Sequence, residues 1–344
     1  MRLLSTLLLA VLAFSAIAQG TQDAHAYLSA IGNQFYEISN ARMSYTSAAS
    51  HGKSARKVEK RRTELINSIK TAEAAVRKMK PFNGSVAYRD SVVSYLKLNR
   101  IVITEDYGKI VDLEEIAEQS YDAMEAYMLA KEKAEEKLDT AFSNVFAQQK
   151  LFAATNDITL VASDSKLSQK LRTSGKVIQY YNPVYLIFFK SYKDEGYVMD
   201  AVNRNDINAM EQTKNALLAS AENGLKQLQS ISSFRGDASL KAACQQILAF
   251  YKMEASQKIQ EVINFQLKKE NYDKMREALE AKRPADRTKQ DVDNFNKMVK
   301  EYNDSVNKIN AMHNDLNKKR AESLEKWNNA SENFLDKHIP KYNG

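Results

Sequence analysis

The histidines of this chain are few and their spacing matches no common metal-binding motif. There are four: His25, His51, His313 and His338. None belongs to an H-E-x-x-H, E-x-x-H or H-x-x-E pair. A di-iron helical bundle takes Glu-x-x-His from two helices, and a zinc site needs several His or Cys ligands. We therefore predict no metal ion and no other cofactor, and we expect His313 to be a packing residue.

The serine and cysteine patterns do not indicate nucleophilic catalysis either. No G-x-S-x-G sequence occurs, and the S-x-x-K matches at Ser50 and Ser54 lack their companion motifs. Cys244 is the only cysteine, and we expect it to be buried. We predict that the protein is not an enzyme. A hydrolase with two carboxylates brought together only by folding leaves no linear motif, so that alternative stays open.

A basic run, HGKSARKVEKRR, extends from His51 to Arg62. It places Lys53, Lys57 and Arg61 near one helical face, where they could bind an anionic glycan, a lipid headgroup or an acidic protein partner. The alternative is the solvated start of a helix. We take these three residues as candidate partner-binding residues.

An aromatic run, YYNPVYLIFFKSY, extends from Tyr180 to Tyr192. Tyr181, Tyr185 and Tyr192 share one helical stripe and are further candidates, because aromatic surfaces stack on sugars and form protein interfaces. The alternative is packing between two helical bundles. We expect Trp327 to be buried as well.

Helical composition and periodicity dominate the rest of the chain. Only ten glycines and four prolines interrupt long segments rich in Ala, Lys, Glu, Gln and Leu. Apolar residues step by three and four along one stripe, as in a bundle helix. In the stretch from Val58 to Met79 these residues are Leu65, Ile69, Ala72, Val76 and Met79.

The same stripe returns 152 residues later as Leu217, Ala221, Gly224, Leu228 and Ile231. The turn that follows returns too, because residues 82–85, FNGS, correspond to residues 234–237, FRGD. Such self-similarity predicts an internal duplication. It also explains the Arg-Gly-Asp tripeptide at Arg235 as a turn, with a left-handed Gly after a helix and a capping Asp, and not as a receptor signal.

These patterns predict an all-α protein of two tandem antiparallel four-helix-bundle repeats, elongated in shape. We expect a signal peptide at 1–18, a first repeat at 19–154, a linker at 155–182 and a second repeat at 183–344. Helices are expected at about 22–50, 53–80, 86–111, 113–154, 183–203, 206–232, 238–269 and 291–337, with a polar loop at 282–290.

The amino-terminal residues indicate export. One positive charge at Arg2 precedes an apolar run that ends in an Ala-x-Ala cleavage site at Ala16–Ala18. The absence of a cysteine after that site argues against a lipid anchor, and no second apolar segment predicts an integral membrane span. We expect a periplasmic or surface location. The net charge of +7 is interleaved along helices, which argues against nucleic-acid binding.

Several segments resemble an uncharacterised family of bacterial surface proteins, of the leptospiral surface protein type and found in Bacteroidetes-like bacteria. They are SARKVEKRR, YRDSVVSYLKLN, EQSYDAMEAY, NPVYLIFFKSYK and FLDKHIP. The resemblance covers most of the chain and implies an exported helical protein without an assigned activity. It supplies no functional residues.

The function that we predict is therefore that of an exported, non-enzymatic helical protein that binds another envelope protein or a glycan. The alternative is a carrier that holds a small ligand in a cleft between the two bundles.

Overall fold

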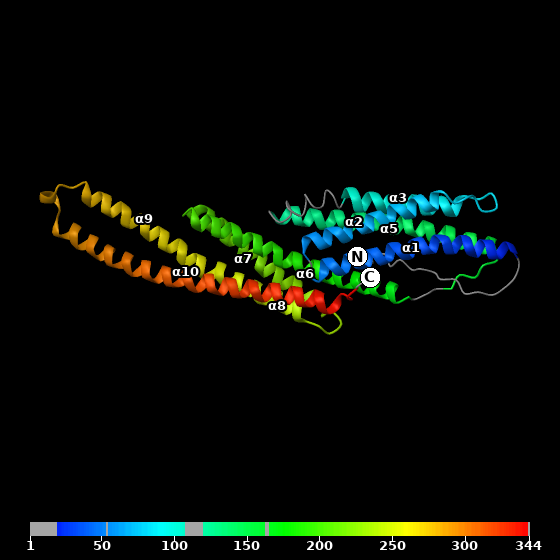
Figure 1. Ribbon diagram of the computed structural model, residues 1–344. Helices are drawn as coiled ribbons and strands as arrows, with labels where there is room; N and C mark the ends of the chain where they lie inside the picture. Colours follow the sequence, from blue (N-terminus) through cyan, green and yellow to red (C-terminus); the bar gives the residue numbers. More distant parts are fainter. Residues whose placement is uncertain (1–18, 53, 107–119, 162–164, 343–344) are drawn as a thin grey trace. The chain divides into compact units, whose positions relative to one another are not determined.

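The computed structural model describes residues 19–52, 54–106, 120–161 and 165–342 (Figure 1). Over these ranges the chain is helical and forms no β-strand, which confirms the all-α prediction. It divides into two compact units. Among the described residues, the first unit comprises those from 19 to 182 together with 332–342, and the second comprises those from 183 to 331.

The first unit packs antiparallel helices around an aromatic core. The rings of Phe35 and Tyr95 lie 5.8 Å apart, and Phe142 lies 5.4 Å from Tyr95. The start of α6 and the end of α10 complete this unit. Its own elements are α1 (Gln19–Ser50), α2 (Ala55–Arg77), α3 (Ala87–Ile101), the π-helix η1 (Val102–Asp106) and α5 (Tyr121–Thr155).

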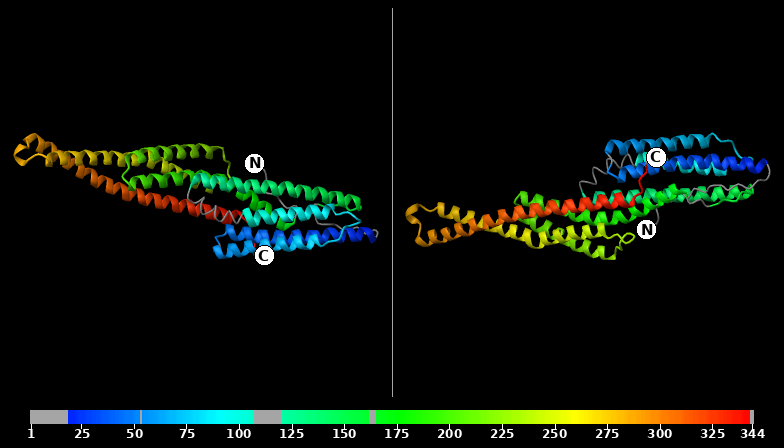
Figure 2. Two further views of the ribbon diagram at one scale, coloured as in Figure 1. Left: turned by 90° about the horizontal axis from the view of Figure 1, so that it is seen from above. Right: turned by 60° about the horizontal axis from the view of Figure 1, so that its bottom comes forward.

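The second unit has its core around the only tryptophan, Trp327, which is 2% exposed and stacks on Phe188 with ring centres 4.3 Å apart. Here α9 and α10 lie side by side (Figure 2), with the Tyr272 and Tyr302 rings stacked at 4.6 Å. The elements that begin after α5 are α6 (Lys166–Asn203), α7 (Ile207–Ser230), α8 (Ser239–Met253), the π-helix η2 (Glu254–Ile259), α9 (Gln260–Glu280), the 3₁₀-helix η3 (Pro284–Asp286) and α10 (Lys289–His338).

Several boundaries differ from the expected ranges, and the helix expected to end at 269 continues as α9 to Glu280. Helix α6 begins at Lys166 and runs through Pro183, so most of the expected linker at 155–182 is helical. An interior proline costs a helix about 3 kcal/mol, and the burial of Val177, Val184 and Phe188 along α6 opposes that cost. At the other end, residues 332–342 belong to the first unit and not to the unit that contains 183–331.

The two related turns adopt one conformation, which differs from the expected helix cap. Asn83 and Gly84 have φ of 47° and 81°, and Arg235 and Gly236 have φ of 52° and 86°. The flanking residues of each turn exchange two backbone hydrogen bonds, as in the two-residue turn of a hairpin. Because α2 and α7 end several residues earlier, the glycines serve these tight turns and do not cap helices.

The tripeptide Arg235-Gly236-Asp237 is therefore part of a tight turn. The Asp237 carboxylate accepts a hydrogen bond from the Ser239 amide at 2.9 Å, which explains an acidic residue at this place.

Replacement of Gly236 by alanine should lower the free energy of unfolding by about 1–2 kcal/mol, because a Cβ is strained at positive φ. The matched control is Arg235→Asn, since asparagine holds the same left-handed conformation at Asn83. We expect that variant to be neutral or slightly stabilising. Urea unfolding of both variants checks the prediction, and an unaffected Gly236→Ala protein contradicts it.

Candidate functional site

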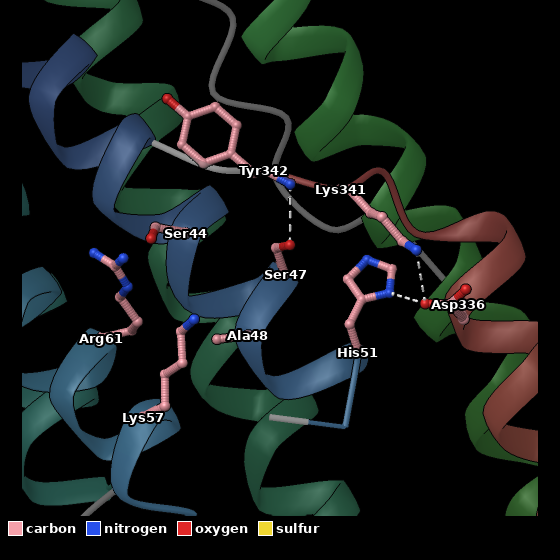
Figure 3. Close-up of a pocket in the computed structure, with 9 residues that line it drawn as sticks. All are labelled: Ser44, Ser47, Ala48, His51, Lys57, Arg61, Asp336, Lys341 and Tyr342. Atoms are coloured by element: carbon pink, nitrogen blue, oxygen red, sulfur yellow. Dashed lines mark hydrogen bonds and ion pairs between the residues drawn. The ribbon is translucent and has the colours of Figure 1, made fainter. Parts of the chain in front are cut away.

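A polar pocket of about 340 Å³ lies in the first unit, at the carboxyl end of α1 and the start of α2 (Figure 3). Its walls combine hydroxyls, cations and one carboxylate from segments far apart in the sequence. They are Ser44, Ser47, Ala48, His51, Lys57, Arg61, Asp336, Lys341 and Tyr342.

An imidazole–carboxylate pair forms one side of the pocket. His51 Nδ1 lies 2.7 Å from Asp336 Oδ1, and the His51 side chain is only 5% exposed. The hydrogen bond from His51, followed by that from Lys341, holds the pKa of Asp336 below its usual value. The ionised carboxylate must accept the hydrogen bond, so Nδ1 carries the proton and the buried Nε2 has no partner.

The other charged side chains of the pocket are cations. Lys57 is exposed and forms no ion pair or hydrogen bond with any residue that the structure describes. Arg61 donates from Nη1 to the Glu64 carboxylate at 2.7 Å, which leaves the rest of its guanidinium available. Lys341 Nζ lies 3.3 Å from Asp336. The pocket wall therefore carries more positive than negative charge.

The carboxyl-terminal segment is held against α1 by polar contacts. The Tyr342 amide donates to Ser47 Oγ at 3.1 Å, and its hydroxyl contacts Asn40 Oδ1 at 2.5 Å. Lys170 Nζ donates to the backbone carbonyl of Lys341 at 3.0 Å. These contacts position Lys341 and Asp336 beside His51.

The pocket contains a His–Asp pair and two serines, but it lacks the contact that activates a serine nucleophile. Activation requires a hydrogen bond between the serine Oγ and His Nε2. Ser47 Oγ instead accepts from the Tyr342 amide, while His51 Nε2 has no hydrogen-bond partner. The arrangement is suited to holding an anion by charge and hydrogen bonds.

The structure brings two of the six candidate residues together. Lys57 and Arg61 both line the pocket, whereas Lys53 lies outside the described residues. None of the three tyrosines lines it.

Tyr181, in the first unit, is half-buried. Tyr185 and Tyr192 belong to the second unit, where Tyr185 stacks on Phe189 at 5.7 Å and Tyr192 stacks on Phe188 at 5.5 Å. Tyr192 is 37% exposed, while both phenylalanines are buried. Much of the aromatic run therefore serves the core of the second unit.

A second cluster of charged groups is buried in the second unit. Arg320 of α10 forms ion pairs with Glu195 of α6 and with Glu254 at the start of η2. The Glu254 side chain is fully buried, and the exposed fractions of Glu195 and Arg320 are 6% and 15%. The Arg320 guanidinium thus forms ion pairs with two carboxylates that are shielded from water.

Burial changes the proton affinity of these carboxylates. Desolvation, opposed by the Arg320 charge, raises the pKa of Glu254 to about 7, and it also raises the pKa of Glu195. Glu254 Oε2 has no hydrogen-bond partner, which favours the protonated acid. Nowhere in the described ranges do three or more His, Cys, Asp or Glu side chains gather in a way suited to a metal ion.

Other residues singled out by sequence lie in the second unit. Cys244 is buried, with Sγ 3.7 Å from the Val184 carbonyl oxygen, and burial raises its pKa to about 12. His313 is half-buried, and burial lowers its pKa; its Nε2 has no hydrogen-bond partner. Trp327 is buried as predicted. A protonated Cys244 is a poor nucleophile, which fits a packing role.

Sequence reasoning missed the partners of the pocket and the buried ion cluster. His51 and Asp336 are 285 residues apart, and no local pattern connects them. The buried ion cluster could have been predicted from the sequence. Arg320 continues the stripe of Ile309, His313 and Leu316 at helical spacing. A charge at a core position of a stripe indicates a buried partner of opposite charge.

No protein-family model, curated protein or solved structure matches this chain. The resemblance to bacterial surface proteins therefore stays a prediction. Across the part of the chain that the structure describes, every helix is too short or too polar to cross a membrane.

Proposed function

We propose that this is an exported, non-enzymatic helical protein of the bacterial envelope, periplasmic or at the surface, that binds a glycan through the pocket of its first unit. The observation that carries this proposal is a polar pocket with surplus positive charge and no activated nucleophile. The apolar run and cleavage site at 1–18 support export, and those residues lie outside the described ranges.

A glycan fits the pocket better than an envelope protein does. Stable protein interfaces bury roughly 800 Å² on each partner and have an apolar centre. A concave polar site of about 340 Å³ instead suits one sugar residue with an anionic substituent. The carrier of a small ligand in a cleft between the two bundles remains the alternative prediction.

We further propose that the chain arose by internal duplication into two four-helix bundles. Helices α3 and α8 each span 15 residues and begin 152 residues apart. The π-helices η1 and η2 also begin 152 residues apart, and the two tight turns share their backbone conformation. A π-helix is rare, so its recurrence at this offset supports a common origin.

Binding of soluble polysaccharides to the purified protein tests the proposed function. We expect polygalacturonate, which bears one carboxylate per sugar, to bind at physiological salt, and neutral dextran not to bind. Thermophoresis of the labelled protein measures both affinities. The proposal fails if neither polymer binds, or if the protein cleaves the polysaccharide and releases new reducing ends.

A further inference from the structure

Resting on the proposed function, we propose that the pocket of the first unit binds the phosphate group of a phosphomonoester, with Lys57 and Arg61 as its cationic ligands. The shared chemistry is a terminal phosphate, which is carried by a phosphorylated sugar or by a lipid headgroup.

The balance of charge favours an anionic ligand. The pocket is lined by three cations, Lys57, Arg61 and Lys341, and by one carboxylate, that of Asp336. Asp336 is already engaged by His51 and Lys341. Lys57 therefore stays uncompensated, and an anion in the pocket neutralises it.

The start of α2 itself favours negative charge nearby. Lys57 lies in the first turn of α2, and that turn has no acidic residue and no side-chain cap from Ser54. The amide groups at a helix start carry partial positive charge that favours anions.

The directions of the donors favour phosphate over carboxylate. The Ser44 hydroxyl comes from α1, while the Lys57 ammonium and the Arg61 guanidinium come from α2 (Figure 3). Donors from two different helices suit a tetrahedral group with three acceptor oxygens and nearly two negative charges. A planar carboxylate matches only part of that set, and Glu64 already occupies one edge of Arg61.

The volume indicates that the phosphate belongs to a larger molecule. A pocket of about 340 Å³ falls in the range of small-molecule sites, which is roughly 300–1,000 Å³. The Ser47 hydroxyl accepts from the Tyr342 amide and can still donate its own hydrogen to a sugar or a glycerol group. The phosphate then provides the charge, and the attached group fills the remaining space.

Calorimetry with three soluble probes at constant ionic strength tests this proposal: glucose 6-phosphate, glucuronate and glucose. We expect glucose 6-phosphate to bind about tenfold more tightly than glucuronate, and glucose not to bind. The double variant Lys57→Gln/Arg61→Gln should weaken glucose 6-phosphate binding tenfold or more, because each lost charge-assisted hydrogen bond is worth about a factor of ten.

The matched control is Lys70→Gln, because Lys70 is an exposed cation on the same helix that does not line the pocket. Its affinity for glucose 6-phosphate should equal that of the unmodified protein. Circular dichroism establishes that the variants are folded, since both altered pocket residues are at least partly exposed.

Cosedimentation distinguishes the two sources of phosphate. Phosphatidylcholine vesicles that contain phosphatidic acid are compared with vesicles that contain phosphatidylglycerol, a phosphodiester. Selective binding to phosphatidic acid, lost in the double variant, supports a lipid source, and binding of glucose 6-phosphate alone supports a sugar source. The inference is overturned if neither phosphomonoester binds, if glucuronate binds equally well, or if the double variant binds normally. Polygalacturonate binding that persists in that case leaves the proposed function standing.

Discussion

Replacement of Arg320 by leucine should lower the free energy of unfolding by about 3–5 kcal/mol, the largest effect expected for a single change. The substitution leaves the carboxylates of Glu195 and Glu254 buried without a counter-charge. The loss should shrink below about pH 4, where both carboxyls are protonated in the folded and unfolded chain. Urea unfolding followed by the fluorescence of Trp327, in the core of the same unit, measures it.

Two variants separate the ion cluster from general effects on α10. Lys318→Leu on the same helix removes a cation that is 78% exposed, and its effect should stay within about 0.5 kcal/mol. The triple variant Glu195→Leu/Glu254→Met/Arg320→Leu removes the whole cluster and should recover most of the stability lost in Arg320→Leu. A mild effect of Arg320→Leu at neutral pH, comparable to that of Lys318→Leu, contradicts the buried cluster.

The second unit should lose stability as pH rises from about 4.5 through about 7, on the order of 2–3 kcal/mol at most. The folded-state pKa of Glu254 is raised, so the folded chain binds more protons than the unfolded chain over this window. The stabilisation is therefore present at low pH and is lost as pH rises through the folded pKa.

Glu254→Gln keeps the shape of the side chain and removes its titration. This variant should flatten the pH dependence and exceed the unmodified protein in stability at pH 8, and Glu195 accounts for the slope that remains. Glu280→Gln, at a side chain that is 68% exposed, serves as the control and should leave the slope unchanged. Urea unfolding at several pH values measures the slope of the free energy of unfolding against pH. Equal slopes in Glu254→Gln and the unmodified protein contradict the conclusion that Glu254 causes this slope.

The helices were predictable because their evidence is local. Leu65, Ile69 and Val76 repeat at helical spacing, and all three are buried. The expected start of α6 at Pro183 was wrong, because local propensity says nothing about the burial of Val177 and Phe188 that keeps the helix continuous from Lys166. Burial depends on the partner helices and not on the segment alone.

The site was predictable in part for the same reason. Lys57 and Arg61 share one helical face within one basic run, and both line the pocket. Asp336, Lys341 and Tyr342 come from the far end of the chain and bear no sequence relation to that run. Only the packing of the carboxyl-terminal segment against α1 brings them to His51.

Nuclear magnetic resonance shows directly whether the pocket of the first unit is a site for anions. The Nε–Hε signal of Arg61, assigned with an Arg61→Lys variant, and the ring signals of His51 are followed as glucose 6-phosphate is added. We predict that both signals shift together and saturate, while the Nε–Hε signal of Arg235, in the second unit, stays in place. Unchanged Arg61 and His51 signals, or equal shifts at Arg235, would contradict it.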